Sequence, residues 1–179
     1  MRITAGEFRS RAFSAPDVDG LRPTSSRVRE ALFNILGDIE GWNILDLFSG
    51  SGIMTIEALS RGAGHAISIE QDKTACRHLR SLAGKFQIEK RWVIQQTSLP
   101  KALDGIKNQH FDWIFADPPY ACGIAEQIPL WLKQTNITAS SLVIEESARA
   151  KPKWPHGWQV SSRNYGDTNL YFLQQEPSS

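Results

Sequence analysis

The sequence predicts an α/β fold with a mainly parallel sheet of seven strands, helices on both faces and an antiparallel hairpin at the C-terminus. Short apolar runs recur along the chain, and helical patterns separate them. Near the end, two strand-like runs flank Gly166-Asp167, which is typical of a hairpin turn. Strands that alternate with helices pair in parallel through right-handed crossovers. The 179 residues, 41% of them apolar, suffice for one such domain.

The N-terminal part should differ from the rest. We expect residues 1–22, with Ile3 and Phe8 among glycine and basic residues, to form a small basic strand appendage to a main domain of residues 23–176. Thr24 or Ser25 is placed to cap a first helix. The apolar residues of that helix fall on one face, namely Val28, Ala31, Leu32, Ile35 and Leu36. We expect the last residues, EPSS, to be frayed.

The main domain reads as strands and helices in turn. Buried strands are predicted at Asn43–Ser49, His65–Glu70, Arg91–Gln96, Phe111–Asp117 and Ser141–Glu146. The helices between them are expected at Ile53–Leu59, from an Asp72 cap to Leu82, at Leu99–Ile106 and at Ile124–Leu132. The hairpin of residues 158–175 then closes the edge of the sheet.

A glycine-rich turn, DLFSGSG, follows the first predicted strand. Gly50 and Gly52 let a ligand approach the backbone there, and Glu70 ends the next strand, where a carboxylate can hold a ribose diol. Thr55 stands where a dinucleotide site needs its third glycine, and the turn lacks the lysine of a phosphate loop. A ligand with a ribose and an amino-acid end fits Asp46 and the two glycines better. S-adenosylmethionine has both.

A second motif, IFADPPY at Ile114–Tyr120, follows the fourth predicted strand. Two consecutive prolines remove backbone N–H donors and keep the chain extended. The Asp117 carboxylate, the carbonyls and the Tyr120 ring offer acceptors and a stacking face to a planar molecule with an NH2 group. Because parallel strands share one carboxyl edge, we expect this loop beside the glycine turn. Taken alone, the heptapeptide is equally consistent with an ordinary proline-rich turn.

The net charge of +1 gives no argument for nucleic acid, but the distribution of charge does. Residues 149–163 carry four cationic side chains and no carboxylate, with Trp154 and Trp158 between them. Near the N-terminus the candidates for phosphate contacts are Arg9, Arg11, Arg22, Arg27 and Arg29. Two alternatives stay open: a solvated surface, and pairing of Arg27 or Arg29 with Glu30 or Glu57.

Other chemistry is not indicated. Cys76 and Cys122 are too far apart for a CxxC element, and the histidines have no ligand spacing, so we expect no metal. The longest apolar runs are too short to cross a bilayer, and the start of the chain has no signal-peptide apolar region. We therefore expect a protein that acts in the cytoplasm, without a membrane partner.

The motifs DLFSGSG, Ile69-Glu70 and DPPY resemble those of class I S-adenosylmethionine-dependent methyltransferases that act on exocyclic amines. The segments RITAGEFRSR, LRPTSSRVREALFNIL, GSGIMTIEALSRGA and YGDT extend the likeness. With them the chain resembles the bacterial RsmD family from Arg2 to Phe172. That resemblance implies a Rossmann-like fold, S-adenosylmethionine as the cofactor, and methyl transfer to the N2 amine of a guanine in 16S ribosomal RNA, either naked or in an assembling small subunit. We expect a monomer.

The resemblance also implies roles for individual residues. Asp117, Pro118, Pro119 and Tyr120 would form the catalytic loop. The cofactor would be held by Asp46, Phe48, Gly50, Ser51, Gly52, Glu70, Gln71, Thr97, Ser98 and Asp117. The family usually has an amide or carboxylate after the third strand, whereas this chain has Thr97-Ser98, so a hydroxyl or a backbone amide would meet the adenine.

Three alternatives share these motifs. Adenine N6 methyltransferases and glutamine-amide methyltransferases resemble the chain at DPPY, often with Asn in place of Asp117. A non-catalytic RNA-binding module on the same fold is the third. The Glu145-Glu146 pair is a poor acid/base dyad, because adjacent residues of a strand point to opposite faces.

Overall fold

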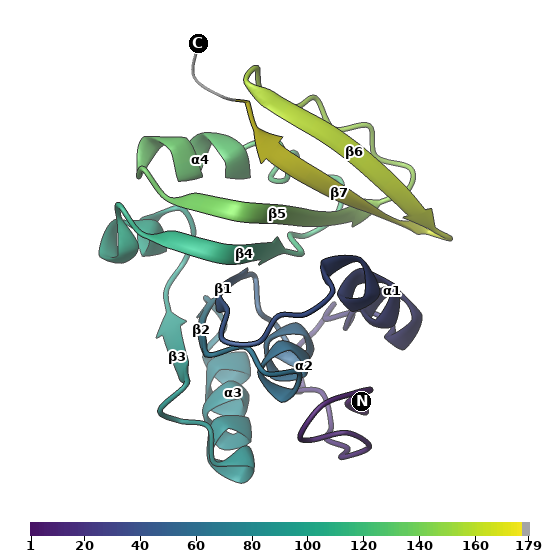
Figure 1. Ribbon diagram of the computed structural model, residues 1–179, viewed down its shortest axis with the longest axis vertical. Helices are drawn as coiled ribbons and strands as arrows, with labels where there is room; N and C mark the ends of the chain where they lie inside the picture. Colours follow the sequence, from purple (N-terminus) through teal and green to yellow (C-terminus); the bar gives the residue numbers. More distant parts are fainter. Residues whose placement is uncertain (177–179) are drawn as a thin grey trace. The chain divides into compact units, whose positions relative to one another are not determined.

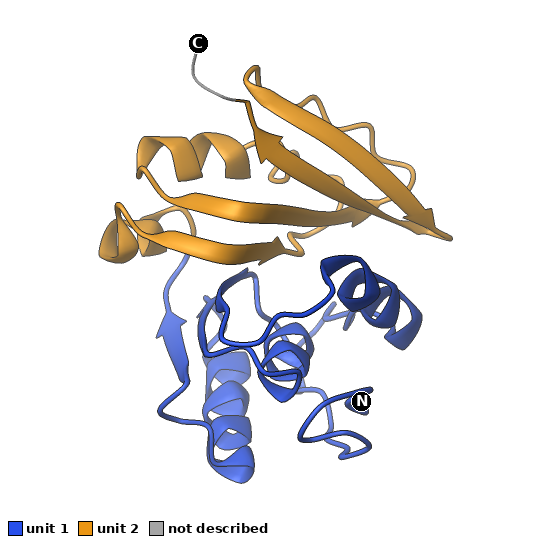
Figure 2. Ribbon diagram, in the orientation of Figure 1, with its two compact units in different colours: residues 1–98 blue, residues 99–179 orange. Residues whose placement is uncertain are grey.

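The computed structural model describes residues 1–176, and Figure 1 shows the elements in chain order. The chain divides into two compact units, residues 1–98 and residues 99–179, which Figure 2 colours separately. Residues 1–22, predicted as an appendage, belong to unit 1. The expectation for the C-terminal tail falls on residues 177–179, outside the described residues. Among the helices of residues 1–176, none is long and apolar enough to span a membrane.

Unit 1 holds three parallel strands and three helices. The strands are β1 (Asn43–Leu47), β2 (His65–Glu70) and β3 (Trp92–Gln96), in the spatial order β3-β2-β1. The helices are α1 (Ser26–Leu36), α2 (Ile53–Ser60) and α3 (Lys73–Phe86). Two caps are confirmed, because Ser25 accepts a hydrogen bond from the amide of Val28 and Asp72 accepts one from the amide of Ala75. Helix α3 extends one turn beyond the predicted Leu82.

The N-terminal segment forms a short loop, whose two ends pair, and it packs against the rest of unit 1. A single isolated antiparallel bridge pairs Arg2 with Ala12. The buried rings of Phe8 and Phe13 contact Phe86 of α3, with centroids 5.0 and 6.3 Å apart. At Gly6 (φ 80°) a Cβ would lie 1.7 Å from the carbonyl oxygen of Ser60, so only glycine allows this approach.

Unit 2 holds the other four strands, β4 (His110–Ala116), β5 (Thr138–Ser147), β6 (Trp158–Tyr165) and β7 (Thr168–Gln175), in the order β4-β5-β7-β6. β4 and β5 are parallel, whereas β7 is antiparallel to both β5 and β6, which confirms the C-terminal hairpin. Its turn lies at Gly166-Asp167, as predicted. The seven strands form the mainly parallel sheet of the predicted α/β fold.

Two predicted helices of unit 2 differ from expectation. The segment Leu99–Ile106 is a 3₁₀ helix, η1 (Lys101–Ile106), rather than an α-helix, and this short segment contains Gly105, which disfavours a longer one. Helix α4 (Ile128–Gln134) begins four residues later than predicted, with Pro129 in its first turn. The preceding residues 117–127 are therefore loop, and they include the DPPY motif.

Candidate functional site

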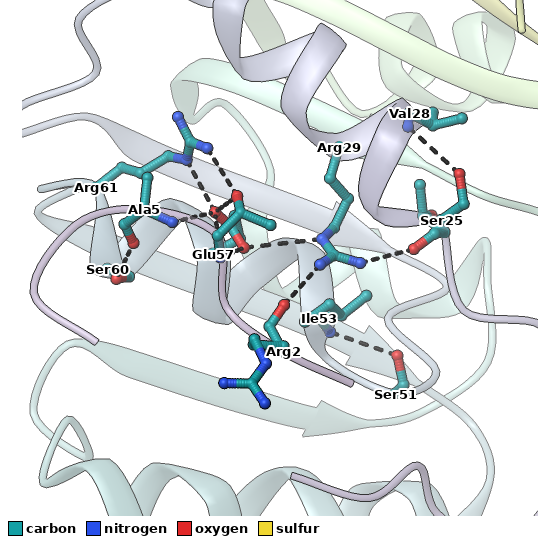
Figure 3. Close-up of polar contacts among 12 residues, drawn as sticks. Arg2, Ala5, Ser25, Val28, Arg29, Ser51, Ile53, Glu57, Ser60 and Arg61 are labelled. Carbon is teal, nitrogen blue, oxygen red and sulfur yellow. Dashed lines mark hydrogen bonds and ion pairs between the residues drawn. The ribbon is translucent and has the colours of Figure 1, made fainter. Parts of the chain in front are cut away.

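The glycine turn of unit 1 joins β1 to α2 through backbone conformations that few residues adopt. Phe48, Gly50 and Gly52 have φ values of 66°, 49° and 74°. A Cβ at Gly52 would lie 2.4 Å from Leu79 Cδ2 and 3.0 Å from Trp92 Cη2, so the turn lies directly against α3 and β3. Gly52, the N-cap of α2, offers no side chain to the helix amides, and the amide of Ile53, the first helical residue, donates to Ser51 Oγ at 3.4 Å (Figure 3).

Glu70 connects the ends of β1 and β2. Its Oε2 accepts a hydrogen bond from the amide of Gly50 at 2.9 Å, and its Oε1 accepts one from the amide of Asp72 at 2.7 Å. A carboxylate offers about four acceptor positions, so these two amides leave room for two hydroxyl donors. The half-buried carboxylate is thus oriented before any ligand binds, in the place expected for a ribose diol.

Asp46 lies beneath the glycine turn, 3% exposed. Its Oδ2 accepts a hydrogen bond from the Thr55 hydroxyl at 2.6 Å, and that hydroxyl is 2.9 Å from Ser68 Oγ, which in turn accepts from Trp92 Nε1 at 2.9 Å. Burial raises the pKa of Asp46 to about 7, against the opposing effect of the Thr55 hydrogen bond. The geometry assigns Asp46 to support of the turn, and its contact with a cofactor stays a prediction.

The remaining unit 1 candidates also follow the carboxyl ends of its strands. Ser51 is buried in the glycine turn, Gln71 is exposed after β2, and Thr97 and Ser98 follow β3. The amide of Thr97 donates to the carbonyl of Glu70 at 3.0 Å, which brings the third loop to the second. A hollow of about 480 Å³ lies at the amino ends of β1 and β2, lined among others by Glu40, Gly62 and Arg91, and none of the predicted site residues lines it.

The predicted catalytic loop lies in unit 2, at the carboxyl end of β4. Asp117 is half-buried, Pro118 is buried, and Pro119 and Tyr120 are exposed. The Tyr120 hydroxyl donates to Glu145 Oε1 at 2.9 Å and lies 3.2 Å from Thr168 Oγ1. Burial and the Glu145 carboxylate raise the pKa of Tyr120 above its ordinary value, so the phenol stays protonated. The residue is 36% exposed and therefore accessible to a flat partner.

The basic residues of the N-terminal region divide into two groups. Arg9, Arg22 and Arg27 are exposed, and Arg11 is exposed with its guanidinium 4.2 Å from the centroid of the Phe86 ring. Arg29 departs from expectation, because it is 3% exposed. Its guanidinium donates to the carbonyl of Thr24 at 2.9 Å and to that of Arg2 at 2.8 Å, and Figure 3 shows the contact with Arg2. Arg29 is therefore structural, not a phosphate contact.

Glu57 on α2 is the anion that Arg29 faces. It is fully buried, and it lies 3.7 Å from Arg29 Nε and 3.0 Å from Arg61 Nε. The amides of Thr4 and Ala5 also donate to its carboxylate, as Figure 3 shows for Ala5. This network fastens the N-terminal segment to α1 and α2. The sequence offered Glu57 only as one of two alternative partners of Arg27 or Arg29.

The cationic segment of unit 2 is exposed. Arg149, Lys151, Lys153 and Arg163 all face solvent. The edge strand β6 is exposed along residues 159–164. Trp154 is less available than the sequence suggests, because its ring packs on Tyr171 with centroids 5.0 Å apart. The surface thus combines exposed cations with polar strand residues, which suits a phosphate backbone.

Comparisons with known proteins match nearly the whole chain. A family model described as conserved hypothetical protein 95 matches residues 1–174. The ribosomal RNA small subunit methyltransferase D of Haemophilus influenzae is 37% identical over 98% of this chain and 93% of its own length. The protein of the same name from Escherichia coli K12 is 31% identical over 98% of this chain and 89% of its own.

Solved structures share the fold. The Escherichia coli protein yhhF has a TM-score of 0.84 and 28% identity, covering 99% of each chain. An RNA methyltransferase from Salinibacter ruber, solved in complex with S-adenosyl-L-homocysteine, has a TM-score of 0.68 and covers 88% of this chain and 96% of its own. At 15% identity, that second likeness concerns the fold alone.

Proposed function

The chain belongs to the family of conserved hypothetical protein 95, which includes the ribosomal RNA small subunit methyltransferases D, and from that premise we propose that it methylates the N2 amine of a guanine in 16S ribosomal RNA. As a member of this family it is an S-adenosylmethionine-dependent enzyme that methylates ribosomal RNA. The finer proposal concerns the base, the atom and the RNA. The observation that carries it is the loop Asp117–Tyr120, which follows β4 with a half-buried carboxylate and an exposed aromatic ring.

The residues of unit 1 fit the cofactor. Glu70 keeps acceptor positions for a ribose, and Gly52 has a left-handed conformation in the turn that the Glu70 carboxylate holds. The start of α2 suits the carboxylate of an amino-acid end, because the positive end of the helix dipole lies there. Thr97 and Ser98 are the proposed neighbours of the adenine. When bound, S-adenosylmethionine supplies a methyl group activated on a sulfonium.

The chain's own part in the reaction is to hold an amine. An exocyclic amine of guanine is a weak nucleophile, because its lone pair is delocalised into the ring. We assign the Asp117 carboxylate and the Pro118 carbonyl as acceptors for its two N–H groups, which favours the pyramidal nitrogen that forms during attack. Tyr120 stacks on the base. Positioning of this kind lowers a barrier by several kcal/mol, about 7 to 11 in the best oriented model reactions.

The RNA must present an unstacked base to reach such a loop, which favours a loop or a distorted helix over a closed duplex. Arg9, Arg11, Arg22 and Arg27 are the proposed phosphate contacts in unit 1. The exposed cations of residues 149–163 are the corresponding candidates in unit 2. We propose that the protein acts as a monomer on 16S ribosomal RNA, naked or within an assembling small subunit.

The test is transfer of a labelled methyl group to ribosomal RNA and to small-subunit particles, followed by mass analysis of the nucleosides. We expect N2-methylguanine, which excludes adenine and glutamine as targets. Asp117→Ala should abolish transfer while the protein stays folded, as judged by circular dichroism. Transfer to neither substrate, or an unchanged Asp117→Ala variant, would contradict the proposal and favour a non-catalytic RNA-binding module.

A further inference from the structure

Two adjacent buried carboxylates near the end of β5 have no part in the proposed chemistry. Glu145 is 4% exposed and Glu146 is 2% exposed. Burying an ionised carboxylate is costly unless hydrogen bonds replace its water. Both carboxylates accept such bonds from the loop that carries Asp117 and Tyr120.

The two residues contact different parts of that loop. Glu145 accepts the Tyr120 hydroxyl at 2.9 Å, which fixes the far end of the ring. Glu146 accepts the amide of Ala121 at 3.2 Å and the amide of its own neighbour Ser147 at 2.6 Å. Because consecutive residues of a strand point to opposite faces, β5 holds the side chain of the loop with one glutamate and its backbone with the other.

The backbone that Glu146 holds is strained. Ala121 has a φ of 57°, a left-handed conformation that costs a residue with a Cβ of the order of 1 kcal/mol. Pro118 and Pro119 stiffen the residues before it. A strained residue persists only where its surroundings over-determine it, and here the Glu146 carboxylate supplies a charge-assisted hydrogen bond to the strained amide.

We propose that Glu145 and Glu146 are positioning residues that hold the loop of residues 117–121 in the conformation that receives the target amine. Glu145 sets the angle of the Tyr120 ring on which the base stacks, and Glu146 sets the turn at Ala121 that ends the loop. The inference rests on the proposed function, since it assigns the two carboxylates to the same reaction. It adds the residues that make an exposed loop precise enough for methyl transfer.

The experiment compares Glu145→Ala, Glu145→Gln and Tyr120→Phe in methyl transfer to ribosomal RNA. Glu145→Ala should lower kcat about 10- to 100-fold, as misplacement near a reacting group does, with the KM for S-adenosylmethionine unchanged. Glu145→Gln keeps an acceptor for the Tyr120 hydroxyl and should recover most of the activity. Gln127→Ala, a change at an exposed position just before α4 and away from these contacts, serves as the control and should keep the wild-type kcat.

A double-mutant cycle separates positioning from stability. If Glu145 acts through Tyr120, the combination of Glu145→Ala with Tyr120→Phe should be no slower than the slower single variant. If Glu145→Ala does not fold, Tyr120→Phe removes the same hydrogen bond from the exposed side. For Glu146, the exchange rate of the Ala121 amide, measured by NMR in Glu146→Ala, should rise at least severalfold, because that amide loses its acceptor.

The outcomes are distinct. A wild-type protein that transfers no methyl group to RNA overturns the proposed function and this inference with it. An active wild type whose Glu145→Ala and Tyr120→Phe variants keep the full kcat overturns the inference alone. Fully additive losses in the double-mutant cycle, or an unchanged exchange rate of the Ala121 amide, would also overturn the inference alone.

Discussion

The amide of Gly50 donates a hydrogen bond to the Glu70 carboxylate at 2.9 Å, so the turn after β1 is fastened to the end of β2 before a cofactor arrives. The other oxygen of Glu70 holds the amide of Asp72, which begins the approach to α3. One side chain therefore organises two loops, and the proposed ribose contact uses the same carboxylate. Removing it affects both the loops and the ligand.

We predict that Glu70→Ala weakens the binding of S-adenosylmethionine by at least about tenfold, because the ribose loses its acceptor and two loop amides lose theirs. Glu70→Gln keeps one acceptor oxygen, so its affinity for S-adenosylmethionine should lie between those of the wild type and of Glu70→Ala. Isothermal titration calorimetry measures both. Glu89→Ala, at an exposed position of the same unit, is the control, and equal affinities for all variants would contradict the assignment.

Gly52 and Gly20 form a pair for a second prediction. Both have φ near 75°, but a Cβ at Gly52 would meet Leu79 at 2.4 Å, whereas at Gly20 it would meet no described atom within 4 Å. Gly20→Ala therefore reports backbone strain alone, about 1 kcal/mol. Gly52→Ala adds overpacking, about 1 to 3 kcal/mol more in urea denaturation, and should also weaken cofactor binding. Equal losses for the two variants would show that the close approach at Gly52 is unimportant.

Arg27 and Arg29, two residues apart on α1, should respond in opposite ways. Arg29→Ala leaves the buried Glu57 short of a partner and should cost about 3 to 5 kcal/mol of the free energy of unfolding. Arg27→Ala removes an exposed cation, so stability should hold while the affinity for ribosomal RNA falls. Chemical denaturation and filter binding test the two effects. A stable Arg29→Ala variant with weakened RNA binding would restore the role the sequence suggested.

Sequence patterns reveal features that depend on residues close together in the chain. The Ser25 and Asp72 caps and the Gly166-Asp167 turn were predictable because each depends on residues within a few positions of one another. The ends of the parallel strands, and with them Gly50 and Glu70, followed from the alternation of apolar runs.

Contacts between distant positions were not predictable in this way. Thr4 meets Glu57 across 53 positions, and Tyr120 meets Glu145 across 25. Neither glutamate differs locally from a solvated one, because its burial is decided by the segment that packs over it. The sequence therefore placed Arg29 among the candidate phosphate contacts, with pairing to Glu57 only as an alternative, and left Glu145 and Glu146 without a role.

The cationic segment of unit 2 yields a prediction in terms of salt. We expect the combined change of Lys151→Ala and Lys153→Ala to weaken RNA binding and to reduce the slope of log affinity against log salt by about 0.7 for each phosphate that the variant no longer neutralises. Cofactor affinity should not change. Lys133→Ala, on α4, is the control for an exposed cation elsewhere in the unit. An unchanged slope would assign residues 149–163 to a merely solvated surface.

The pKa of Asp46 gives a dependence on pH whose sign can be worked out. Burial raises this pKa from 3.8 to about 7, so between these values the folded protein holds a proton that the unfolded chain has released. Stability due to this group is therefore fully present below the unfolded value and is lost as the pH rises to about 7.

Asp46→Asn removes the titration but keeps an oxygen to accept from Thr55. Subtracting its free energy of unfolding from that of the wild type isolates the contribution of Asp46. From pH 5 to pH 8, the free energy of unfolding of the wild type should fall relative to that of Asp46→Asn, by on the order of a few kcal/mol. A difference that stays constant across this range would mean that the Asp46 carboxylate is ionised throughout, which would require a donor beyond Thr55 to offset its burial.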